Sequence, residues 1–464
     1  MKKIFVSFVV FLCGLNLMAQ DTVFLSLQEC RERALMFNQD VTKQKNVSKQ
    51  MELTRKATLT NFFPQVEGTA MGVYMGDMHM MDNAFMSVDM VMQGAYMAGF
   101  TLTQPIYAGG KIVNGYRLTK IGKEVAQEQV RKTKSEIIAQ IDNTYWTFVA
   151  TLNKEQLLQE YANQLDTLIE QLIASVEVGM TTEYDLMRVR VSRSNIEYQH
   201  NRTKNGVQMC RLSLCQQIGL LEDTAFIMPE CQMPPYNDDY KQQVDLSNRP
   251  EMRLLDYQLR AQQLQVKMTV GDYLPTIGLM AGYTWYGNMK LKANIDPDMN
   301  QYGQTLQQLS VASDQLGIQM PPLTFPHQTT NEMEDKMPMV MLSLSVPLTK
   351  WSEGALKIKK AKLEAENTQL EVQKNKELMQ LEVQQARCNV EDSKKLVSSA
   401  QIALEMATEN LRIMREKYDV KMISLSDLLD AQNQWHQAES DYIEARTQQL
   451  IYHTEYLRVT GQLE

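Results

Sequence analysis

The side chains that could do chemistry in this sequence are few and widely spaced. Its five histidines share no ligand spacing: His79, His200, His327, His436 and His453. No nucleophile elbow, phosphate-binding loop or metalloprotease helix accompanies them. The carboxylates along the expected helices have the spacing of ordinary solvated helix faces. We therefore expect neither enzymatic activity nor a cofactor.

Methionine is the first residue type with chemical potential that clusters in the sequence. Nine methionines lie between positions 71 and 97, and Met78, His79, Met80 and Met81 stand together within that run. Thioether sulfur is a soft ligand that suits Cu(I). The chain holds 32 methionines in all, so packing in a loop or along a strand explains the run as well. Packing is the favoured interpretation, and a copper site at these four residues is the alternative.

A pair of aspartates is the second group of residues that could do chemistry. Asp427 and Asp430 are three residues apart, a spacing that places both on one helix face. Repeated around a symmetry axis, such a pair forms a ring of carboxylates that attracts cations and narrows a pore. Position 430 corresponds to Arg188 in the first half of the chain. It therefore differs between the halves, as a residue with a single role would.

A capping role competes for Asp427. Ser424 stands three residues before it, and Thr182 stands three residues before Asp185 in the same way. This is the spacing of a capping box, in which a hydroxyl and a carboxylate satisfy free N–H groups at a helix start. A carboxylate there also favours the positive end of the helix dipole. Thr182, Asp185 and Ser424 are therefore predicted helix caps.

The elements that position these residues begin after an export signal, which we predict over residues 1–19. Lys2 and Lys3 precede a short apolar run, and Leu17 and Ala19 fit a cleavage site. After this segment no apolar run reaches the roughly 18 residues of a spanning helix, which argues against a helical inner-membrane protein.

The rest of the chain repeats itself, with a first repeat over 20–240 and a second over 241–464. The sequence at 61–66 resembles that at 272–277, and 102–106 resembles 344–348. From Pro105 to Val178 and from Pro347 to Val420 the spacing is 73 residues in both cases. Loops change length cheaply, whereas helices that must end at one level do not. Equal spacing therefore predicts two matched rods.

The rods have the pattern of long helices. Apolar residues from 356 to 411 fall on a seven-residue grid, with mostly small residues three positions later. Such heptads let neighbouring helices approach closely. About 65–70 helical residues at ~1.5 Å each form a rod of roughly 100 Å. Each rod should fold back at a tip, near 178–185 in the first repeat and near 420–427 in the second.

Between the helices, four segments alternate apolar and polar residues as strands do: 64–76, 98–105, 275–287 and 338–347. Long connections are expected over 75–97 and 288–337. Strands with one apolar face are typical of a membrane barrel, although a half-buried soluble sheet has the same pattern. Four strands cannot close a barrel in lipid, where every edge must be paired and closure needs about eight or more. A homo-oligomer is therefore expected, and three copies give twelve strands.

These features together resemble the TolC family of outer membrane factors. The resemblance rests on the two-fold repeat, the aromatic-x-Pro strand starts, the proline strand ends and the two helix tips, and it extends over the mature chain. It implies a mainly α fold with β. Duplicated α-helical coiled-coil hairpins would form a periplasmic tunnel, and four strands per chain would contribute to a trimeric twelve-stranded transmembrane β-barrel.

The resemblance also implies a function, that of an outer-membrane channel subunit in a tripartite efflux or type I secretion system of a Gram-negative bacterium. Its partners would be two further copies of itself, outer-membrane lipid, a periplasmic adaptor and, through the adaptor, an inner-membrane pump of RND or ABC type. A net charge of -8 without a basic stripe gives no support to nucleic-acid binding. A periplasmic adaptor or other structural coiled-coil protein is the alternative, although adaptors lack duplicated strand pairs.

By the same resemblance, the two tips dock the adaptor through a Val-Gly-x element. The residues concerned are Val178, Gly179, Met180, Val420, Lys421 and Met422. The second tip has lysine where the family has glycine, so the backbone freedom of glycine is lost there. Asp427 and Asp430 match the paired aspartates of the family's constriction, which would make them the gate.

Overall fold

The computed structural model describes residues 23–83, 86–221, 226–227, 245–295, 328–348 and 352–463. The expected signal segment lies outside these residues. The chain forms two compact units. The helical unit is built from Met1–Leu53, Lys120–Gln262 and Ala365–Glu464, and the sheet unit from Thr54–Thr119 and Gln263–Glu364. Each unit therefore takes a part from both sequence repeats.

Two long helices confirm the matched rods. Helices α4 (Lys111–Glu177) and α8 (Glu353–Asp419) have 67 residues each, or roughly 100 Å at ~1.5 Å per residue. Each folds back into a shorter helix, α5 (Glu183–Ile218) with 36 residues and α9 (Leu425–Val459) with 35. In the described part of the chain, no helix combines the length and the apolar character that a membrane-spanning helix needs.

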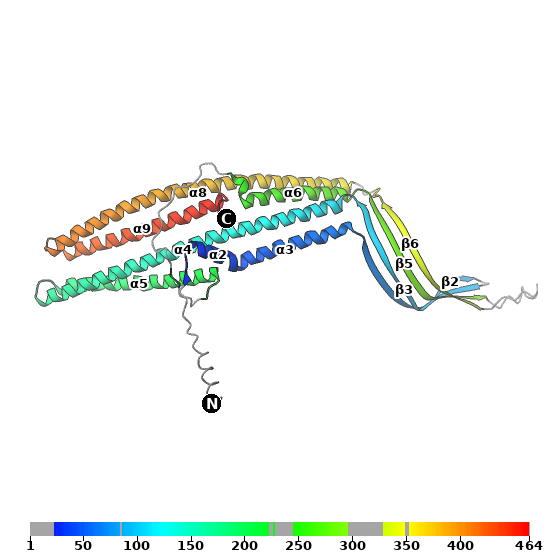
Figure 1. The fold of residues 1–464 in the computed structure, drawn as a ribbon, viewed down its shortest axis with the longest axis horizontal. Coiled ribbons are helices and arrows are strands. Elements are labelled where there is room, and N and C mark those ends of the chain that lie inside the picture. The colour runs from blue at the N-terminus through cyan, green and yellow to red at the C-terminus, as the bar shows by residue number, and fades with distance from the viewer. Residues whose placement is uncertain are drawn as a thin grey trace, which may run out of the picture. The chain divides into compact units, whose positions relative to one another are not determined.

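In the helical unit, α4 and α9 lie between α5 and α8 (Figure 1). Lys154 of α4 pairs with Glu444 of α9 at 3.1 Å, and the Tyr161 hydroxyl donates to Asn433 Oδ1 at 3.0 Å. A buried apolar cluster that includes Tyr161 joins α4 and α5 to the start of α9. The outer sides of α5 and α8 are consequently left without a neighbour among the described helices of one chain.

The heptad grid of α8 divides into two parts. In the later part of the helix the grid residues belong to the core, since Val383, Val390 and Val397 are buried. Near the start of the helix they do not, since Leu356 and Leu363 are exposed in the single chain. The seven-residue repeat therefore continues past the point at which this chain supplies a partner.

Shorter helices complete the structure. They are α2 (Leu27–Phe37), α3 (Gln39–Leu59) and α6 (Pro250–Gly271). Short strands β1 (Val23–Phe24) and β4 (Phe226–Ile227) pair in parallel. Helix α2 is anchored by Arg31, which forms an ion pair with Asp142 of α4, and the buried Asp142 also accepts from the Thr454 hydroxyl at 2.8 Å.

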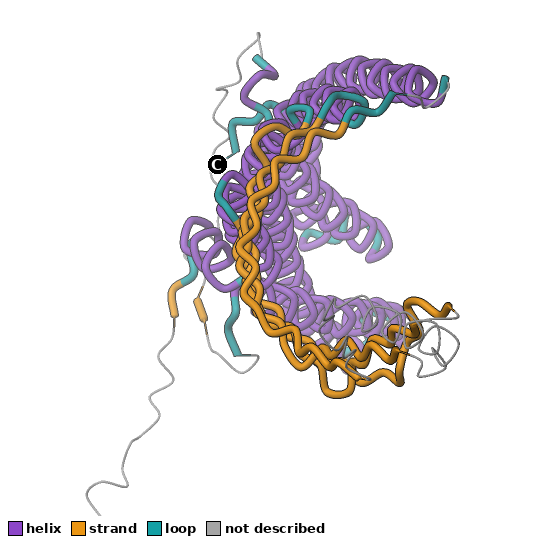
Figure 2. The backbone as a smooth tube through the Cα atoms, turned by 90° about the vertical axis from the view of Figure 1, so that its right-hand side faces the viewer, coloured by secondary structure: helices purple, strands orange, loops and turns teal. Residues whose placement is uncertain are grey.

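The sheet unit holds one antiparallel sheet in the order β2-β3-β5-β6. Its strands are β2 (Gln65–Asn83), β3 (Met86–Ala108), β5 (Thr276–Ile295) and β6 (Gln328–Ser345), and they form a curved layer (Figure 2). The prediction of a long connection over 75–97 was wrong, because β2 and β3 stay paired as far as Asn83 and Met86. Of the second expected connection, 288–337, both ends are strand and residues 296–327 lie outside the described ones.

Irregular backbone explains why the strand ends were hard to predict. Gly94 has a φ of 75° and Asn288 a φ of 58°. The Asn288 side-chain amide donates to the carbonyls of Gln93 and Gly94 at 2.9 and 3.1 Å. Extra residues at such bulges shift the register between strands. They interrupt the apolar–polar alternation by which a strand is recognised.

The two faces of the sheet differ in chemistry, because alternate residues of a strand point to opposite sides. One face, here called the apolar face, carries Val66, Phe100, Tyr283, Trp285, Val340, Leu342 and Leu344. Tyr283 lies 6.2 Å from Phe100 and 4.8 Å from Trp285, measured between ring centroids. The opposite face, here called the polar face, carries Gln65, Glu67, Thr101, Thr103 and Ser343.

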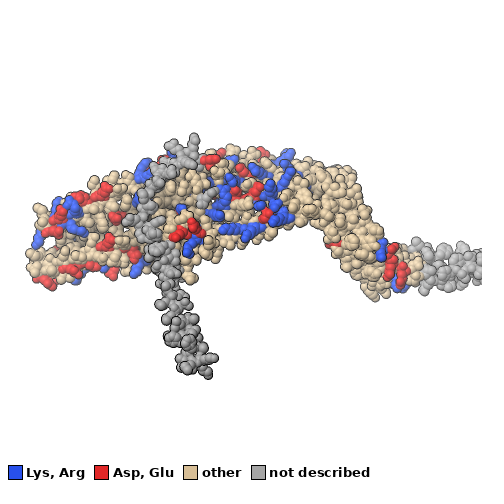
Figure 3. Space-filling view, viewed as in Figure 1, with Lys and Arg blue, Asp and Glu red and all other residues tan. Residues whose placement is uncertain are grey.

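Charged side chains gather at the far end of the strands, near Ile295, where Lys290 pairs with Glu332. Figure 3 shows this charged end and the largely uncharged stretch of strand that precedes it. Such a sheet has an apolar band on one side with a charged rim, which is the layout expected for strands in lipid.

Candidate functional site

The first tip is a tight helix stop. Gly179 follows α4 with a φ of 72°. Its N–H donates to the Val176 carbonyl at 2.9 Å, and the Met180 N–H donates to the Ser175 carbonyl at 2.8 Å. These two bonds form a Schellman motif, which satisfies the last free carbonyls of a helix. Glycine suits the position because a left-handed backbone costs it nothing.

The second tip repeats this geometry without glycine. Lys421 has a φ of 59°. Its N–H donates to the Tyr418 carbonyl at 2.9 Å, and the Met422 N–H donates to the Lys417 carbonyl at 2.8 Å. The loss of glycine thus leaves the backbone of the turn unchanged. It adds instead a cation and a left-handed lysine, which is uncommon and strained.

The two tips meet at their ends. The Lys421 ammonium lies 3.9 Å from the Met180 sulfur. Around this contact Val178, Met180, Val420 and Met422 are all exposed. Four large apolar side chains in water at one end of the helical unit form a surface suited to a partner.

Each return helix begins with a capped turn. The Asp185 N–H donates to the Thr182 hydroxyl, and the Thr182 hydroxyl donates to the Asp185 carboxylate at 2.8 Å. At α9 both halves of a capping box are present, since the Ser424 N–H also donates to the Asp427 carboxylate at 3.0 Å. These bonds from Ser424 to the carboxylate lower the pKa of Asp427.

Asp427 and Asp430 lie together on the exposed side of the first turns of α9. Between them, Leu428 and Leu429 are buried in two different apolar clusters. Leu429 contacts the α4–α5 side, and Leu428 joins a cluster with Leu411 of α8. With both flanks of the helix packed, the two carboxylates are restricted to the remaining side.

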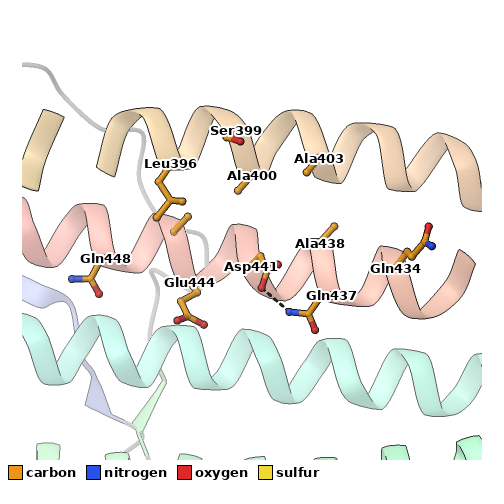
Figure 4. Close-up of a pocket in the computed structure, with 11 residues that line it drawn as sticks. Leu396, Ser399, Ala400, Ala403, Gln434, Gln437, Ala438, Asp441, Glu444 and Gln448 are labelled. Atoms are coloured by element: carbon orange, nitrogen blue, oxygen red, sulfur yellow. Dashed lines mark hydrogen bonds between the residues drawn. The ribbon is translucent and has the colours of Figure 1, made fainter. Parts of the chain in front are cut away.

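That side continues as a polar stripe, which sequence reasoning did not identify. Beyond Asp430 it follows α9 at three- and four-residue spacing through Gln434, Gln437, Asp441 and Glu444, the spacing of one helix face. Beside it a groove of about 630 Å³ runs between α8 and α9 (Figure 4). The α8 wall of the groove is made of Leu396, Ser399, Ala400 and Ala403. The regular spacing of glutamine and carboxylate residues could have revealed the stripe.

The four residues of the copper alternative do not converge. Met78 is paired with Met90, and the next residue, His79, is paired with Asp89. Successive residues of a strand point to opposite faces, so Met78 and His79 are separated by the sheet. The His79 ring also hydrogen-bonds the Asp89 carboxylate. Met80 lies at a register shift, and the Met81 side chain lies outside the described ones.

Comparison with known proteins places this architecture in a family. The sequence matches the family of outer membrane efflux proteins over residues 31–219 and 243–462. No individual curated protein matches the sequence.

Solved structures share the fold at low identity. A structure of CusC, described in terms of transmembrane channel formation, is 12% identical with a TM-score of 0.72 and covers 97% of this chain and 95% of that chain. The Campylobacter jejuni outer membrane channel CmeC is 17% identical with a TM-score of 0.69, and the match covers 94% of this chain and 86% of that chain. The Vibrio cholerae outer membrane protein VceC is 11% identical with a TM-score of 0.70, and the match covers 94% of this chain and 96% of that chain. With both sequence repeats matched, the chain belongs to the outer membrane efflux protein family and is a channel subunit of the Gram-negative outer membrane.

Proposed function

We propose that three copies of this chain assemble into a passive exit duct that crosses the outer membrane and reaches into the periplasm. The observation that carries this proposal is the four-stranded sheet with its apolar face. Among the described residues, the outer edges of β2 and β6 have no strand partner. In lipid an unpaired backbone edge costs several kcal/mol for each free group. Pairing β6 of one copy with β2 of the next removes every free edge once three copies close twelve strands.

The helical unit supports the same assembly. Its outer helices α5 and α8 both carry large exposed apolar side chains, among them Val191 and Tyr198 on α5 and Ile402 and Met406 on α8. In a closed ring, α5 of one copy would meet α8 of the next. Burying both stripes would provide the hydrophobic stabilisation that a single chain forgoes.

We further propose that the tips receive a periplasmic adaptor, which connects the duct to an inner-membrane pump of RND or ABC type. Support comes from the exposed apolar quartet Val178, Met180, Val420 and Met422 and from the matched tip geometry. The competing proposal, that the chain is itself an adaptor, is set aside by the family match over both repeats.

The constriction is proposed at Asp427 and Asp430. Both carboxylates are exposed on the one side of α9 that the chain leaves unpacked. Three copies would place six carboxylates around the duct at its tip end. The Asp430 carboxylate makes no hydrogen bond to a described residue, whereas the Asp427 carboxylate accepts one from the Ser424 hydroxyl, so Asp430 is the freer of the two to face passing ions.

The test is conductance. Asp430→Ala, and more so the double variant with Asp427→Ala, should raise single-channel conductance in planar bilayers and weaken blockage by multivalent cations from the tip side. Glu183→Ala, a carboxylate at the start of α5, is the matched control and should change neither property. A double variant that conducts and blocks like the parent would show that these carboxylates are structural. Failure of the parent to form trimers and channels would overturn the assembly itself.

A further inference from the structure

Where strand pairing is regular and the side chain is described, the methionines of the sheet lie on one side. Strand β6 pairs along β5 without an extra residue of its own, so its alternate residues can be followed from end to end. Met333, Met337, Met339 and Met341 all fall on the polar face, with Ser343. The alternate positions on β6 hold Val340, Leu342 and Leu344 but no methionine.

The same face continues onto β3. Met333 is paired with Met289 of β5, and two residues further on Leu291 is paired with Met90. Met90 therefore lies on the polar face, and so does Met92. Across from them on β2, Met78 is paired with Met90 and Met75 with Met92. Two directly opposed methionine pairs thus stand on neighbouring rungs of one face.

Packing alone does not explain this arrangement. If methionine served here as an interchangeable apolar residue, it should also appear on the apolar face, where packing against lipid is needed. Instead that face uses valine, leucine and aromatic residues in its apolar band, and it carries Asp89, Lys290 and Glu332 at the level of these methionines. The thioethers are accessible as well, since Met75 and Met78 are each 43% exposed and Met90 and Met92 are partly exposed.

The geometry is suited to a ligand that takes several sulfurs. Directly opposed residues of an antiparallel pair have Cβ atoms about 5 Å apart, and the flexible methionine side chain bridges such a gap easily. Soft thioethers select soft cations such as Cu(I) over hard ones. No charge is needed, and the His79–Asp89 contact lies on the other face.

We propose that Met75, Met78, Met90 and Met92 form a thioether site for a soft monovalent cation, Cu(I) or Ag(I), on the channel-lining side of the sheet. That this side lines the channel rests on the proposed function, whereas the site itself depends only on the pairing of β2 with β3. The site differs from the set Met78, His79, Met80 and Met81 because ligands are recruited across strands rather than along one.

Leucine replacement gives a sharp test. Leucine keeps the apolar volume of methionine but removes the sulfur. Full-length protein in detergent, with its methionine methyl groups labelled with ¹³C, is titrated with Ag(I) alone, which needs no reductant. We expect methyl shifts at the four residues. The variant with Met75, Met78, Met90 and Met92 each changed to leucine should bind Ag(I) more weakly by at least about tenfold, as expected when soft ligands are lost.

The matched control changes Met337 and Met339 to leucine. These residues lie on the same face but are paired with Thr284 and Gly282, so Ag(I) affinity at the site should stay unchanged. Each pair variant alone, Met75→Leu with Met92→Leu or Met78→Leu with Met90→Leu, should also lose affinity, and these serve if the fourfold variant fails to fold.

Two results would overturn the proposal: a fourfold variant that binds Ag(I) like the parent, or a parent that binds none. If the face holds apolar cargo instead, an apolar dye should bind parent and leucine variants equally while Ag(I) binds neither. Bilayer conductance of the parent is measured separately, so loss of the channel and loss of the site are distinguishable.

Discussion

At the second helix tip a single lysine holds a backbone conformation that favours glycine. A left-handed residue with a side chain costs roughly 1–2 kcal/mol, and Lys421 is in that region with a φ of 59°. Lys421→Gly should therefore stabilise the turn by about 1 kcal/mol. Amide hydrogen exchange at Met422, whose N–H closes the turn, should slow by about fivefold. Unchanged or faster exchange would show that the side-chain contact of Lys421 with Met180 outweighs the backbone cost.

The first tip offers the converse change. A Cβ added at Gly179 would meet no atom within 4 Å, so Gly179→Ala tests the φ of 72° alone. We expect a loss of about 1 kcal/mol at this turn. Exchange at the Met180 amide should accelerate accordingly, while exchange at Met422 on the other tip serves as the internal control. Equal exchange in parent and variant would remove the backbone argument for both tips.

A buried imidazole in the helical unit predicts acid sensitivity. His436 stacks on Tyr161 at 5.3 Å between ring centroids, and its Nε2 is buried without a hydrogen-bond partner in the described structure. Burial, and next the charge of Lys154, lower the pKa of His436. Below about pH 6.5, His436 is therefore protonated in the unfolded chain but still neutral in the folded chain. Its contribution to the free energy of unfolding is thus fully present above about pH 6.5 and is lost as the pH drops below that value.

The measurement is the midpoint of thermal unfolding between about pH 7.5 and pH 5.5. His436→Phe keeps an aromatic ring against Tyr161 and should make this midpoint less dependent on pH. Part of the dependence should remain, because burial, and next Lys394, lower the pKa of His453 as well. Gln434→Ala, which changes an exposed residue of α9 without a titratable group, is the control. An identical pH dependence in parent and His436→Phe would contradict the assignment.

At this scale the sequence was informative where chemistry is local. The spacing of Ser424 and Asp427 predicted a capping turn, and both halves of the capping box are present. It could not predict that Lys421 adopts the glycine conformation, because that is imposed by the helices on either side. Nor could it pair Met78 with Met90, since strand register depends on bulges elsewhere in the sheet.

At the scale of elements, the backbone at the end of α6 packs tightly against the backbone just after β3, and both contact residues are glycines. Gly271 ends α6, and a Cβ built on it would lie 2.4 Å from the carbonyl oxygen of Gly109, just after β3. Gly271→Ala must push backbone away from backbone and should cost about 2 kcal/mol. Gly115→Ala in α4 meets no atom within 4 Å and should instead stabilise by about 0.5–1 kcal/mol. Thermal midpoints that shift in opposite directions would bear this out, and a parallel shift would refute it.

The lengths of the elements show what sequence patterns can resolve. Helices α4 and α8 follow the equal spacing of Pro105–Val178 and Pro347–Val420, because a heptad pattern continues without interruption. Strands β3 and β5 extend well past their predicted ends, since bulges at Gly94 and Asn288 break the alternation. Strand β6 begins well before its predicted start, because its first half is mostly polar. A polar segment that remains hydrogen-bonded to its neighbour cannot be told from a loop by alternation alone.

For the whole molecule, the proposed ring of three copies predicts which helices touch. Tyr198 of α5 and Ile402 of α8 are exposed and lie roughly four to five turns from their tips. Cysteines at both positions of one chain should cross-link between copies under mild oxidation and give trimers on a denaturing gel. Tyr198→Cys combined with Leu378→Cys, several turns further along α8, is the matched control and should give few. Monomers alone, or equal cross-linking in the control, would reject this pairing.

Assembly was the part of the architecture that sequence approached only by elimination. The exposed Leu356 and Leu363 continue a heptad that the single chain leaves unpartnered, and the sheet ends in two free edges. Both features were visible as patterns, but a pattern does not state the number of copies. In the proposed assembly, the number of copies is set by barrel closure, a property of the oligomer rather than of the chain.

The equal length of the two long helices also restricts which insertions and deletions the protein can tolerate. Helices α4 and α8 have 67 residues each, and their tips meet where Lys421 contacts Met180. A deletion within one helix alone would move one tip away from the other and rotate every side chain beyond it. Only paired deletions or insertions, in steps of roughly seven residues, keep both tips level and the same faces inward. Heritable length variation should therefore concentrate in the loops, while the two long helices lengthen or shorten together.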